Sequence, residues 1–266
     1  MSRFEAKAAL ITGAGSGIGR ATSLALAAEG AFVWVTDFDK ESAEKTAGLI
    51  HEAGGQAQAL RLDVSDEAEW EAAYAQVDTG EVPLGVLVNC AGKSMITDTF
   101  SMALSDLRLL LSINVEGTFL GMKHGIPRVA KAGGGAVVNM SSIMGIKGQS
   151  RMAGYCASKA GIRMMTKAVA LECAELRNGV RVNSIHPGIV DTPAWTRHSN
   201  SEVELLGDRG ADASESPAVD FARKMVPIGV PCSAEEVAEA ILYLASPAAR
   251  HITGAELVID GGMTAD

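Results

Sequence analysis

Short apolar runs rich in β-branched residues alternate with longer segments of helical periodicity along almost the whole chain. This alternation is typical of repeated strand–helix–strand units, which build a parallel sheet covered by helices on both faces. We expect seven short buried strands, at Ala8–Thr12, Phe32–Thr36, Ala57–Leu62, Leu84–Asn89, Ala136–Met140, Val180–His186 and Glu256–Ile259. We expect helices at Gly17–Glu29, Lys40–Ala53, Glu67–Val77, Ser105–Ala132, Gly154–Leu176 and Ala234–Ala245. The predicted fold is a doubly wound α/β domain with a seven-stranded parallel sheet.

The composition supports one packed domain and limits its partners. Hydrophobic residues make up 47% of the 266 residues and charged residues 21%, which is ordinary for a globular protein. The chain has 32 acidic and 23 basic residues, a formal net charge of −9. This acidic balance argues against a nucleic acid or an anionic membrane as the main partner.

The chain shows no targeting or metal-binding pattern. No apolar run approaches the roughly 18 residues that span a bilayer, and the first ten residues lack the apolar core of a signal peptide. We therefore expect a cytoplasmic protein. Four cysteines have neither C-x-x-C spacing nor clustered histidines, so we expect free thiols and no bound metal; they are Cys90, Cys156, Cys173 and Cys232.

One segment lacks the strand–helix rhythm. From Ala194 to Cys232 the chain is polar and acidic, with prolines at 217, 227 and 231. Long irregular insertions in compact domains are often functional loops. We expect residues 194–232 to form a substrate lid that is mobile without ligands and closes over them; the alternative is a tolerated surface insertion.

A glycine-rich turn follows the first predicted strand. Residues 12–19 read Thr-Gly-Ala-Gly-Ser-Gly-Ile-Gly, and a predicted helix starts within them. Glycines let a pyrophosphate approach backbone N–H groups, while the positive end of the helix dipole faces the phosphates. The turn predicts a dinucleotide site of the Rossmann type, and the alternative is a purely structural turn. The expected phosphate-binding residues are Gly13, Ser16, Gly17, Ile18 and Gly19.

An acidic residue, Asp37, ends the second predicted strand and bears on the choice of cofactor. A carboxylate there accepts hydrogen bonds from the ribose hydroxyls of NAD but repels the 2′-phosphate of NADP. The glycine turn and Phe38 offer no compensating cation, so we expect NAD; the alternative for Asp37 is a helix N-cap or turn residue. Asp63, followed by Val64, is placed to bind the adenine amino group, but an N-cap role for Asp63 competes closely.

Three residues form a candidate catalytic group. Tyr155 and Lys159 are four residues apart and so share one face of a predicted helix. Ser142 lies 13 residues before Tyr155, just past the carboxyl end of a predicted strand, where open α/β sheets bind their ligands.

Together these motifs resemble the short-chain dehydrogenase/reductase family, single-domain NAD-dependent branch, over nearly the whole length, residues 1–266. The matching elements are the turn at 13–19, Asp63-Val64, Asn89-Cys90-Ala91-Gly92, Asn114, Ser142, Tyr155, Lys159, Pro187-Gly188 and Asp260-Gly261-Gly262. The departure is Cys90, because the family motif has a second asparagine there. We expect Cys90 to alter a hydrogen bond behind the nicotinamide site without touching the catalytic groups.

The resemblance implies hydride transfer between a carbinol carbon and nicotinamide, with Tyr155 as the general acid/base. A phenol with a pKa of about 10 is too weak a base near neutral pH. Lowering it by two to three units requires about 3–4 kcal/mol, which a cation such as Lys159 at about 4 Å supplies at an effective dielectric near 20. Ser142 would orient the substrate oxygen, and Asn114 would hold a water that links Lys159 to solvent.

The resemblance also implies a wider set of cofactor-binding residues. Lys159 would hold the ribose hydroxyls beside Tyr155, and the run from 187 to 192 would surround the nicotinamide carboxamide. The further expected cofactor residues are Asn89, Ala91, Gly92, Pro187, Gly188, Val190 and Thr192. Two alternatives stay open: Asn114 as a polar residue that bends a helix, and His186 as a packed residue at a strand end rather than a general base.

Mostly apolar residues are expected around the reacting carbon. The expected substrate residues are Ser142, Met144, Gln149, Met152, Tyr155 and Trp195, with Met95, Ile143 and Ile189 nearby. They suit a hydrophobic, cyclic or aryl-bearing secondary alcohol or ketone, as used by hydroxysteroid and secondary-alcohol dehydrogenases of the family. The same methionines would also serve as plain core.

Three functional hypotheses compete. The first is an NAD-dependent secondary-alcohol dehydrogenase. The second is an NADPH-dependent 3-oxoacyl-carrier-protein reductase, against which Asp37 and the acidic balance speak. The third is a dinucleotide-sensing protein without catalysis, which would need neither Ser142 nor Tyr155. The resemblance further implies a homotetramer, built through the long helices Ser105–Ala132 and Gly154–Leu176.

Overall fold

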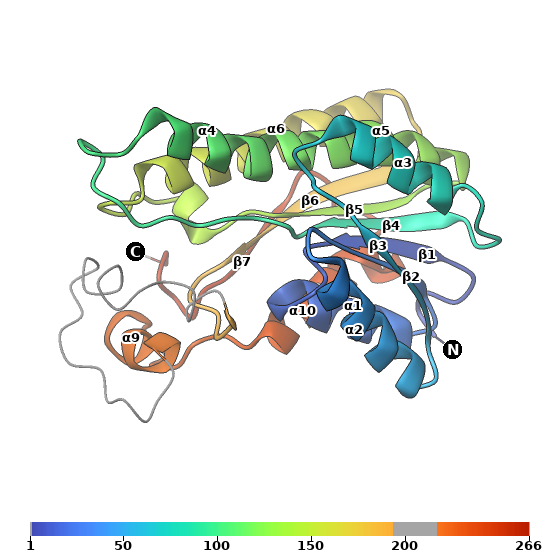
Figure 1. Ribbon diagram of the computed structural model, residues 1–266, viewed down its shortest axis with the longest axis horizontal. Helices are drawn as coiled ribbons and strands as arrows, with labels where there is room; N and C mark the ends of the chain where they lie inside the picture. The colour runs from blue at the N-terminus through green and yellow to red at the C-terminus, as the bar shows by residue number, and fades with distance from the viewer. Residues whose placement is uncertain (1, 194–216, 266) are drawn as a thin grey trace.

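A computed structural model describes residues 2–193 and 217–265, which form a three-layer α/β domain (Figure 1). Seven parallel strands form one sheet in the order β3-β2-β1-β4-β5-β6-β7. The strands are β1 Ala8–Thr12, β2 Phe32–Asp37, β3 Gln56–Arg61, β4 Leu84–Asn89, β5 Gly135–Met140, β6 Val180–Pro187 and β7 Glu256–Ile259. The doubly wound parallel fold expected from the alternation is confirmed.

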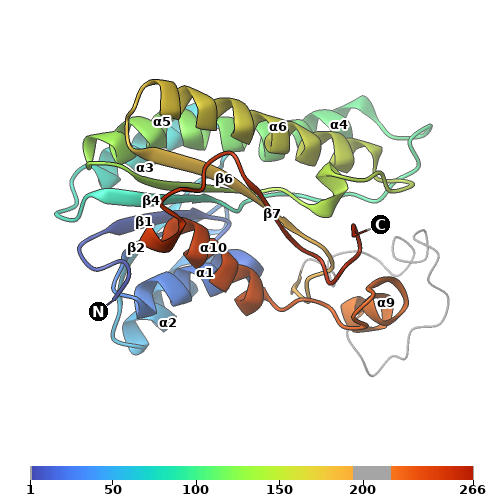
Figure 2. The same cartoon turned by 180° about the vertical axis from the view of Figure 1, so that it is seen from behind.

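Helices cover both faces of the sheet (Figures 1 and 2). On one face lie α1 Gly17–Ala28, α2 Lys40–Glu52 and α10 Ala234–Ala245. On the other lie α3 Glu67–Val77, α4 Leu104–Leu111, α5 Gly117–Lys131 and α6 Ala153–Glu175. A further helix, α9 Pro217–Met225, lies beyond the carboxyl ends of the strands, on the side away from the N-terminus. Short turns of helix are η1 Ser112–Glu116, η2 Ile143–Gly145 and η3 Pro247–Ala249.

The two cores follow from strand geometry, because successive side chains point to opposite faces. In β1, Ala9 and Ile11 pack under α1, α2 and α10, while Ala8 and Leu10 pack on the other side. All five β1 residues are buried, as expected for a central strand. The edge strand β3 is different, because most of its residues are at least partly exposed, so the expectation that every strand is covered on both faces is wrong there.

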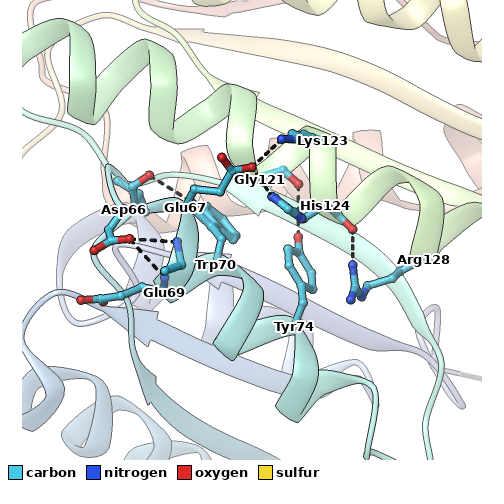
Figure 3. A network of polar contacts seen from close by, with 11 residues as sticks. Asp66, Glu67, Glu69, Trp70, Tyr74, Gly121, Lys123, His124 and Arg128 are labelled. Carbon is cyan, nitrogen blue, oxygen red and sulfur yellow. Dashed lines mark hydrogen bonds and ion pairs between the residues drawn. The ribbon is translucent and has the colours of Figure 1, made fainter.

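Helix α3 is fixed to α5 by buried aromatic side chains and a surface polar network (Figure 3). The Trp70 indole donates to the Val64 carbonyl (2.9 Å), and the Tyr74 hydroxyl donates to the Gly121 carbonyl (3.2 Å). At the surface, Glu67 accepts from both Lys123 and His124. Because α5 continues directly from η1, these contacts also hold the segment that carries Asn114.

Most predicted helix ends lie within one residue of those observed, with two exceptions. The helix expected at Ser105–Ala132 is interrupted by the π-helical turn η1, which separates α4 from α5. The segment 194–232 was expected to lack periodicity, yet it contains α9, which packs against the described part of the domain. The rest of that expected lid, residues 194–216, lies outside the described residues. Among the described helices, none has the length and apolar character to cross a membrane.

Candidate active site

Two cavities lie at the carboxyl edge of the sheet. The first, here called the large cleft, has a volume of about 700 Å³ and is lined by the glycine turn and the ends of β2, β4 and β5. The second, here called the small pocket, has a volume of about 150 Å³. Both sit where parallel strands end, as expected for the ligand sites of an open α/β sheet.

Most expected cofactor residues line the large cleft. They are Gly13, Ser16, Gly17, Ile18, Gly19, Asp37, Phe38, Asp63, Val64, Ala91, Gly92 and Thr192. Further lining residues were not singled out from the sequence, among them Gly15, Asp39, Ser42 and Lys93. Gly15 lies within the predicted turn, Asp39 and Lys93 directly follow the predicted residues Phe38 and Gly92, and Ser42 lies in α2.

The glycine turn is closely packed on itself. A Cβ on Gly19 would lie 2.2 Å from the carbonyl oxygen of Gly13, so no larger residue fits without moving the turn. Ser16 is the N-cap of α1, but its side chain makes no capping hydrogen bond. The first N–H groups of α1 therefore have no side-chain acceptor at the cap and face a cleft suited to a phosphate.

The Asp37 carboxylate is held by the backbone of the turn. It accepts from the N–H of Gly15 (2.9 Å) and from the N–H of Asp39 (3.0 Å). Asp39, not Asp37, is the N-cap of α2. Asp37 thus has the turn role considered as an alternative, and its carboxylate also lines the cleft.

Two arginines, neither predicted at this site, lie beside Phe38 and Gly15, which neighbour Asp37. The Arg61 guanidinium lies 5.0 Å from the ring centroid of Phe38 and is paired with Glu69. The Arg20 guanidinium donates to the Gly15 carbonyl and to the Thr46 hydroxyl (3.0 Å). Both guanidinium groups have protein partners, but the neighbourhood of Asp37 is less free of cations than its sequence indicates.

The competing role of Asp63 as a helix cap is wrong. Asp66 is the N-cap of α3 and accepts from the N–H groups of Ala68 and Glu69 (Figure 3). Asp63 instead accepts from the N–H and the hydroxyl of Ser65, at 3.0 and 2.6 Å, and lines the large cleft.

Asn89 and Cys90 form the inner wall behind the cleft. Asn89 is buried and donates to Asn139 (2.8 Å), so it braces β4 against β5 and does not line the cleft. The N–H groups of Cys90 and Ala91 both donate to the Thr12 hydroxyl at 3.0 Å. Burial raises the pKa of the Cys90 thiol to about 12, so the thiol is neutral at physiological pH.

The run from 187 to 192 divides between the cavities. Thr192 lines the large cleft and Gly188 lines the small pocket. Pro187 is the last residue of β6, and Val190 is buried in the core.

The structure brings Ser142, Tyr155 and Lys159 together. Ser142 and Tyr155 both line the small pocket, and the Ser142 hydroxyl accepts from the Met144 N–H (3.1 Å) and acts on the pKa of the Tyr155 phenol. The Lys159 ammonium lies 5.7 Å from the Tyr155 ring centroid and donates to the Met140 carbonyl (2.8 Å). It would also lie 3.4 Å from a Cβ on Gly92, which lines the large cleft. Lys159 therefore stands between the two cavities.

Burial is the largest influence on the pKa values of Tyr155 and Lys159. It raises the pKa of the Tyr155 phenol to about 12, against the opposing effect of the Ser142 hydrogen bond. It lowers the pKa of the Lys159 ammonium to about 8. In the chain without cofactor the phenol pKa is therefore shifted away from neutrality, opposite to what catalysis requires, because the desolvation cost exceeds the local stabilisation of the phenolate.

Asn114 sits within the π-helical turn η1. Its side-chain oxygen accepts from the Lys93 N–H (2.8 Å), and its amide donates to the Lys93 carbonyl and the Ser158 hydroxyl, both at 2.9 Å. Single π-turns inside helices are frequent at functional sites. The helix is irregular here, in agreement with the alternative that Asn114 is a polar residue that bends a helix. The irregular turn also brings the Asn114 amide to the edge of the cleft, beside Gly92 and Lys159.

The small pocket is mostly apolar. The expected residues Ser142, Met144, Gln149, Met152 and Tyr155 line it, as do Ile143 and Ile189, whereas Trp195 lies outside the described residues. Ser94 and Ile96 line the pocket in place of the expected Met95. Lys147, Phe221, Met225 and Met263 also line the pocket, although the sequence did not predict them there. These come from α9, the C-terminal segment and the turn after η2, and no local pattern links them.

His186 has a packed role. It is fully buried at the end of β6, its Nδ1 donates to the Ser142 carbonyl (3.1 Å), and its Nε2 contacts the Ser184 hydroxyl (2.8 Å). Burial lowers the pKa of the imidazole, which favours the neutral form. This agrees with a structural residue rather than a general base.

Outside these cavities, the part of the chain described here contains one group of possible metal ligands, Glu67, Glu71 and His124. Lys123 and His124 both bond the same Glu67 oxygen (Figure 3). We therefore interpret this group as the ion-pair network between α3 and α5.

Comparisons with known proteins identify the family of this chain. A family model described as enoyl-(acyl carrier protein) reductase matches residues 13–264. The cyclohexanol dehydrogenase of Acinetobacter sp. is 34% identical over 264 residues, covering 99% of this chain and 97% of the relative. The cyclopentanol dehydrogenase of Comamonas testosteroni is 34% identical over the full length of both chains. The NADP-dependent (R)-specific alcohol dehydrogenase of Lentilactobacillus kefiri is 35% identical, covering 99% and 98%. The chain belongs to the short-chain dehydrogenase/reductase family, whose members are nicotinamide-dependent oxidoreductases.

Proposed function

We propose that this protein is an NAD-dependent dehydrogenase of small cyclic secondary alcohols, acting between an alcohol and its ketone. The observation that carries the proposal is the Ser142–Tyr155 hydroxyl pair, which faces a small apolar pocket beside Lys159. A non-catalytic dinucleotide sensor would need the large cleft but not this pair.

The size of the small pocket supports a compact substrate. An apolar protein cavity of about 150 Å³ holds a molecule such as benzene. The small pocket has about this volume, and Met, Ile and Phe side chains form most of its lining, which suits an apolar ring that carries one hydroxyl or keto group. Two relatives are named for cyclohexanol and cyclopentanol, which are rings of this size.

The large cleft fits a nicotinamide dinucleotide. Its volume of about 700 Å³ suits a cofactor, and it combines the start of α1, which has no side-chain cap, with carboxylates at the ends of β2 and β3. Gly13, Gly17 and Ser16 would hold the pyrophosphate, Asp37 the adenosine ribose, and Asp63 the adenine. Oxidised nicotinamide, when bound, supplies the hydride acceptor.

Residues of the chain transfer the proton of the substrate hydroxyl. In the oxidation direction the substrate hydroxyl hydrogen-bonds to Ser142 and gives its proton to the Tyr155 oxygen. Tyr155 can accept this proton only as a phenolate. The pKa of its phenol must therefore fall well below about 12, its value in the cofactor-free chain. Each unit corresponds to about 1.4 kcal/mol, and a cation about 4 Å away at an effective dielectric near 20 contributes about 4 kcal/mol. Lys159, with a pKa of about 8, is mostly charged at neutral pH and supplies such a cation.

The preference for NAD over NADP depends on Asp37. Its carboxylate is held at the cleft wall by two backbone N–H groups, so it would meet a 2′-phosphate as a fixed like charge. The NADP-dependent relative and the nearby Arg61 favour the other cofactor. We favour NAD because Arg61 is already paired with Glu69.

The direct test is a substrate screen by the absorbance of reduced nicotinamide. Purified protein is given NAD or NADP with cyclopentanol, cyclohexanol, linear secondary alcohols and a steroid alcohol. The proposal expects the highest kcat/KM for a five- or six-membered ring with NAD. It fails if no secondary alcohol reduces either cofactor, and a preference for 3-oxoacyl thioesters with NADPH would point to the acyl reductase.

We also propose a homotetramer. Large apolar side chains are exposed on the outer surface of α4, α5 and α6, at Leu104, Phe119, Met164 and Leu171. Such a surface fits an interface between copies of the chain. Light scattering at micromolar concentration is expected to give four times the chain mass, and a monomer would contradict the proposal.

A further inference from the structure

A third cavity lies at the opposite edge of the sheet, near the amino-terminal ends of the strands. Its volume is about 510 Å³, and we call it the amino-edge cleft. In Figure 1 this edge is on the side of the N-terminus, away from α9. The cleft is lined by Lys7, Gly133, Gly134, Gly135, Cys173, Ala174, Arg177, Gly179, Val180, Arg181, Ala245, Pro247 and Arg250.

The charge of this cleft differs from that of the whole chain. Four lining residues are basic, namely Lys7, Arg177, Arg181 and Arg250, and none of the lining residues is acidic. The chain as a whole carries a net charge of −9. The four side chains come from separate segments: the residue before β1, the α6–β6 loop, β6 itself, and the end of η3. The fold therefore gathers four cations from distant parts of the sequence.

One of the four basic residues, Arg181, has hydrogen-bond partners within the protein. Its guanidinium donates to the carbonyls of Leu244 (2.7 Å), Ser246 (3.1 Å), Ala245 and Ile252 (both 3.3 Å). It thereby satisfies the C-terminal carbonyls of α10, a common place for a basic residue. Arg181 therefore has a structural role in the wall of the cleft, which its hydrogen bonds to α10 explain.

The other three cations have no such partner. Within residues 2–193 and 217–265, the side chains of Lys7, Arg177 and Arg250 make no hydrogen bond or ion pair. Like charges that converge on one cavity repel each other, and a bound anion removes that repulsion. Arg177 also has a φ of 50°, a conformation that glycine adopts with less strain. Backbone geometry thus does not account for an arginine at this position.

We propose that the amino-edge cleft binds a small anion through phosphoryl groups, with Arg177, Arg250 and Lys7 as its ligands. Arginine binds phosphate by paired N–H donors, and lysine adds a point charge. Gly133 has open space beside its backbone, whereas Gly134, Gly135 and Gly179 are packed against neighbouring backbone and form the floor of the cleft. No aromatic side chain lines the cleft in the described part of the chain, so nothing there stacks on a nucleobase. The expected ligand is an oligophosphate whose phosphoryl groups alone supply the affinity.

The test is isothermal titration calorimetry of the full chain with tripolyphosphate at physiological ionic strength. The titrations are repeated with saturating NAD, because the large cleft also suits phosphates. The site variant is Arg177→Asn with Arg250→Gln, since asparagine tolerates a positive φ. The matched control is Lys45→Gln with Arg108→Gln, which removes the same charge at exposed positions on α2 and α4.

Binding that persists with NAD, weakens at least tenfold in the site variant and changes less than twofold in the control is the expected result. Adenosine triphosphate is expected to bind within about threefold of tripolyphosphate, since the base finds no stacking partner. The proposal is overturned if tripolyphosphate does not bind, if NAD abolishes its binding, or if both double variants weaken it equally. Tight binding of adenosine triphosphate without binding of tripolyphosphate would overturn the phosphoryl-only recognition.

Discussion

The large cleft and the small pocket share one edge of the sheet but are built in different ways. The large cleft is made of short contiguous motifs, each at the end of a strand, and backbone N–H groups and carboxylates line it. The small pocket collects single side chains from the loops after β4 and β5, from α6, from α9 and from the C-terminal segment. A cofactor shared by many enzymes can be held by local motifs, whereas substrate shape is set by long-range packing.

The largest expected effect lies at the border of the two cavities. Tyr155→Phe removes the hydroxyl that α6 contributes to the small pocket beside Ser142. Turnover of cyclohexanol is expected to fall at least a thousandfold, while NADH binding, measured by fluorescence, changes little because the large cleft is intact.

The matched control is Tyr243→Phe, since Tyr243 is partly exposed on α10. It is expected to keep wild-type turnover. If Tyr155→Phe retained more than a tenth of wild-type turnover near neutral pH, the phenol would not be the acid/base.

The next largest effect is expected at Lys159, which lies between the two cavities, and concerns the pH dependence of stability. Its pKa of about 8 lies below the unfolded value of 10.5, so between these values the unfolded chain binds more protons and stability rises with pH. Lys159→Met removes this contribution. From pH 8 to 9.5 the wild type is expected to gain roughly 2 kcal/mol in unfolding free energy relative to the variant.

Urea unfolding of both proteins at the two pH values measures this difference. Other titrating groups are common to both chains and cancel. If the unfolding free energies of the two proteins changed equally with pH, Lys159 would not have the lowered pKa that its burial implies.

Within the large cleft, Asp37→Ala tests the role of the carboxylate. The wild type is expected to prefer NAD over NADP at least tenfold in kcat/KM, and the variant is expected to narrow that gap, since a fixed negative charge beside the 2′-phosphate is removed. Asp106→Ala, on α4, serves as the control and should leave the ratio unchanged. Equal use of both cofactors by the wild type would contradict the assignment.

The difference between the cavities also explains how much the sequence could predict. The seven-stranded parallel sheet, the glycine turn and the approach of Ser142, Tyr155 and Lys159 follow from motifs whose positions at strand ends are fixed by the fold. Arg61 near Phe38 was missed, because it depends on the register of β2 against β3, where Asp37 pairs with Arg61. Phe221 and Met263 were missed because they reach the small pocket only through tertiary packing of α9 and the C-terminal segment. The π-turn at Asn114 was missed because one extra residue in a helical turn leaves the apolar periodicity nearly unchanged.

The smallest expected effect lies in the small pocket and tests whether α9 shapes it. Phe221 is 9% exposed and packs with Ile143, Ile189 and Met263, whereas Phe100 is fully exposed. Phe221→Ala is expected to raise KM for cyclohexanol about fivefold, a loss of about 1 kcal/mol, with little change in kcat because the ring is remote from the proton transfer. The enlarged pocket should favour a bulkier alcohol such as cyclooctanol over cyclohexanol, relative to the wild type. The same substitution at Phe100 should change neither value. If Phe221→Ala left both KM and the ring-size preference at wild-type values, α9 would not be a wall of the substrate site, and substrate size would have to be set by other residues.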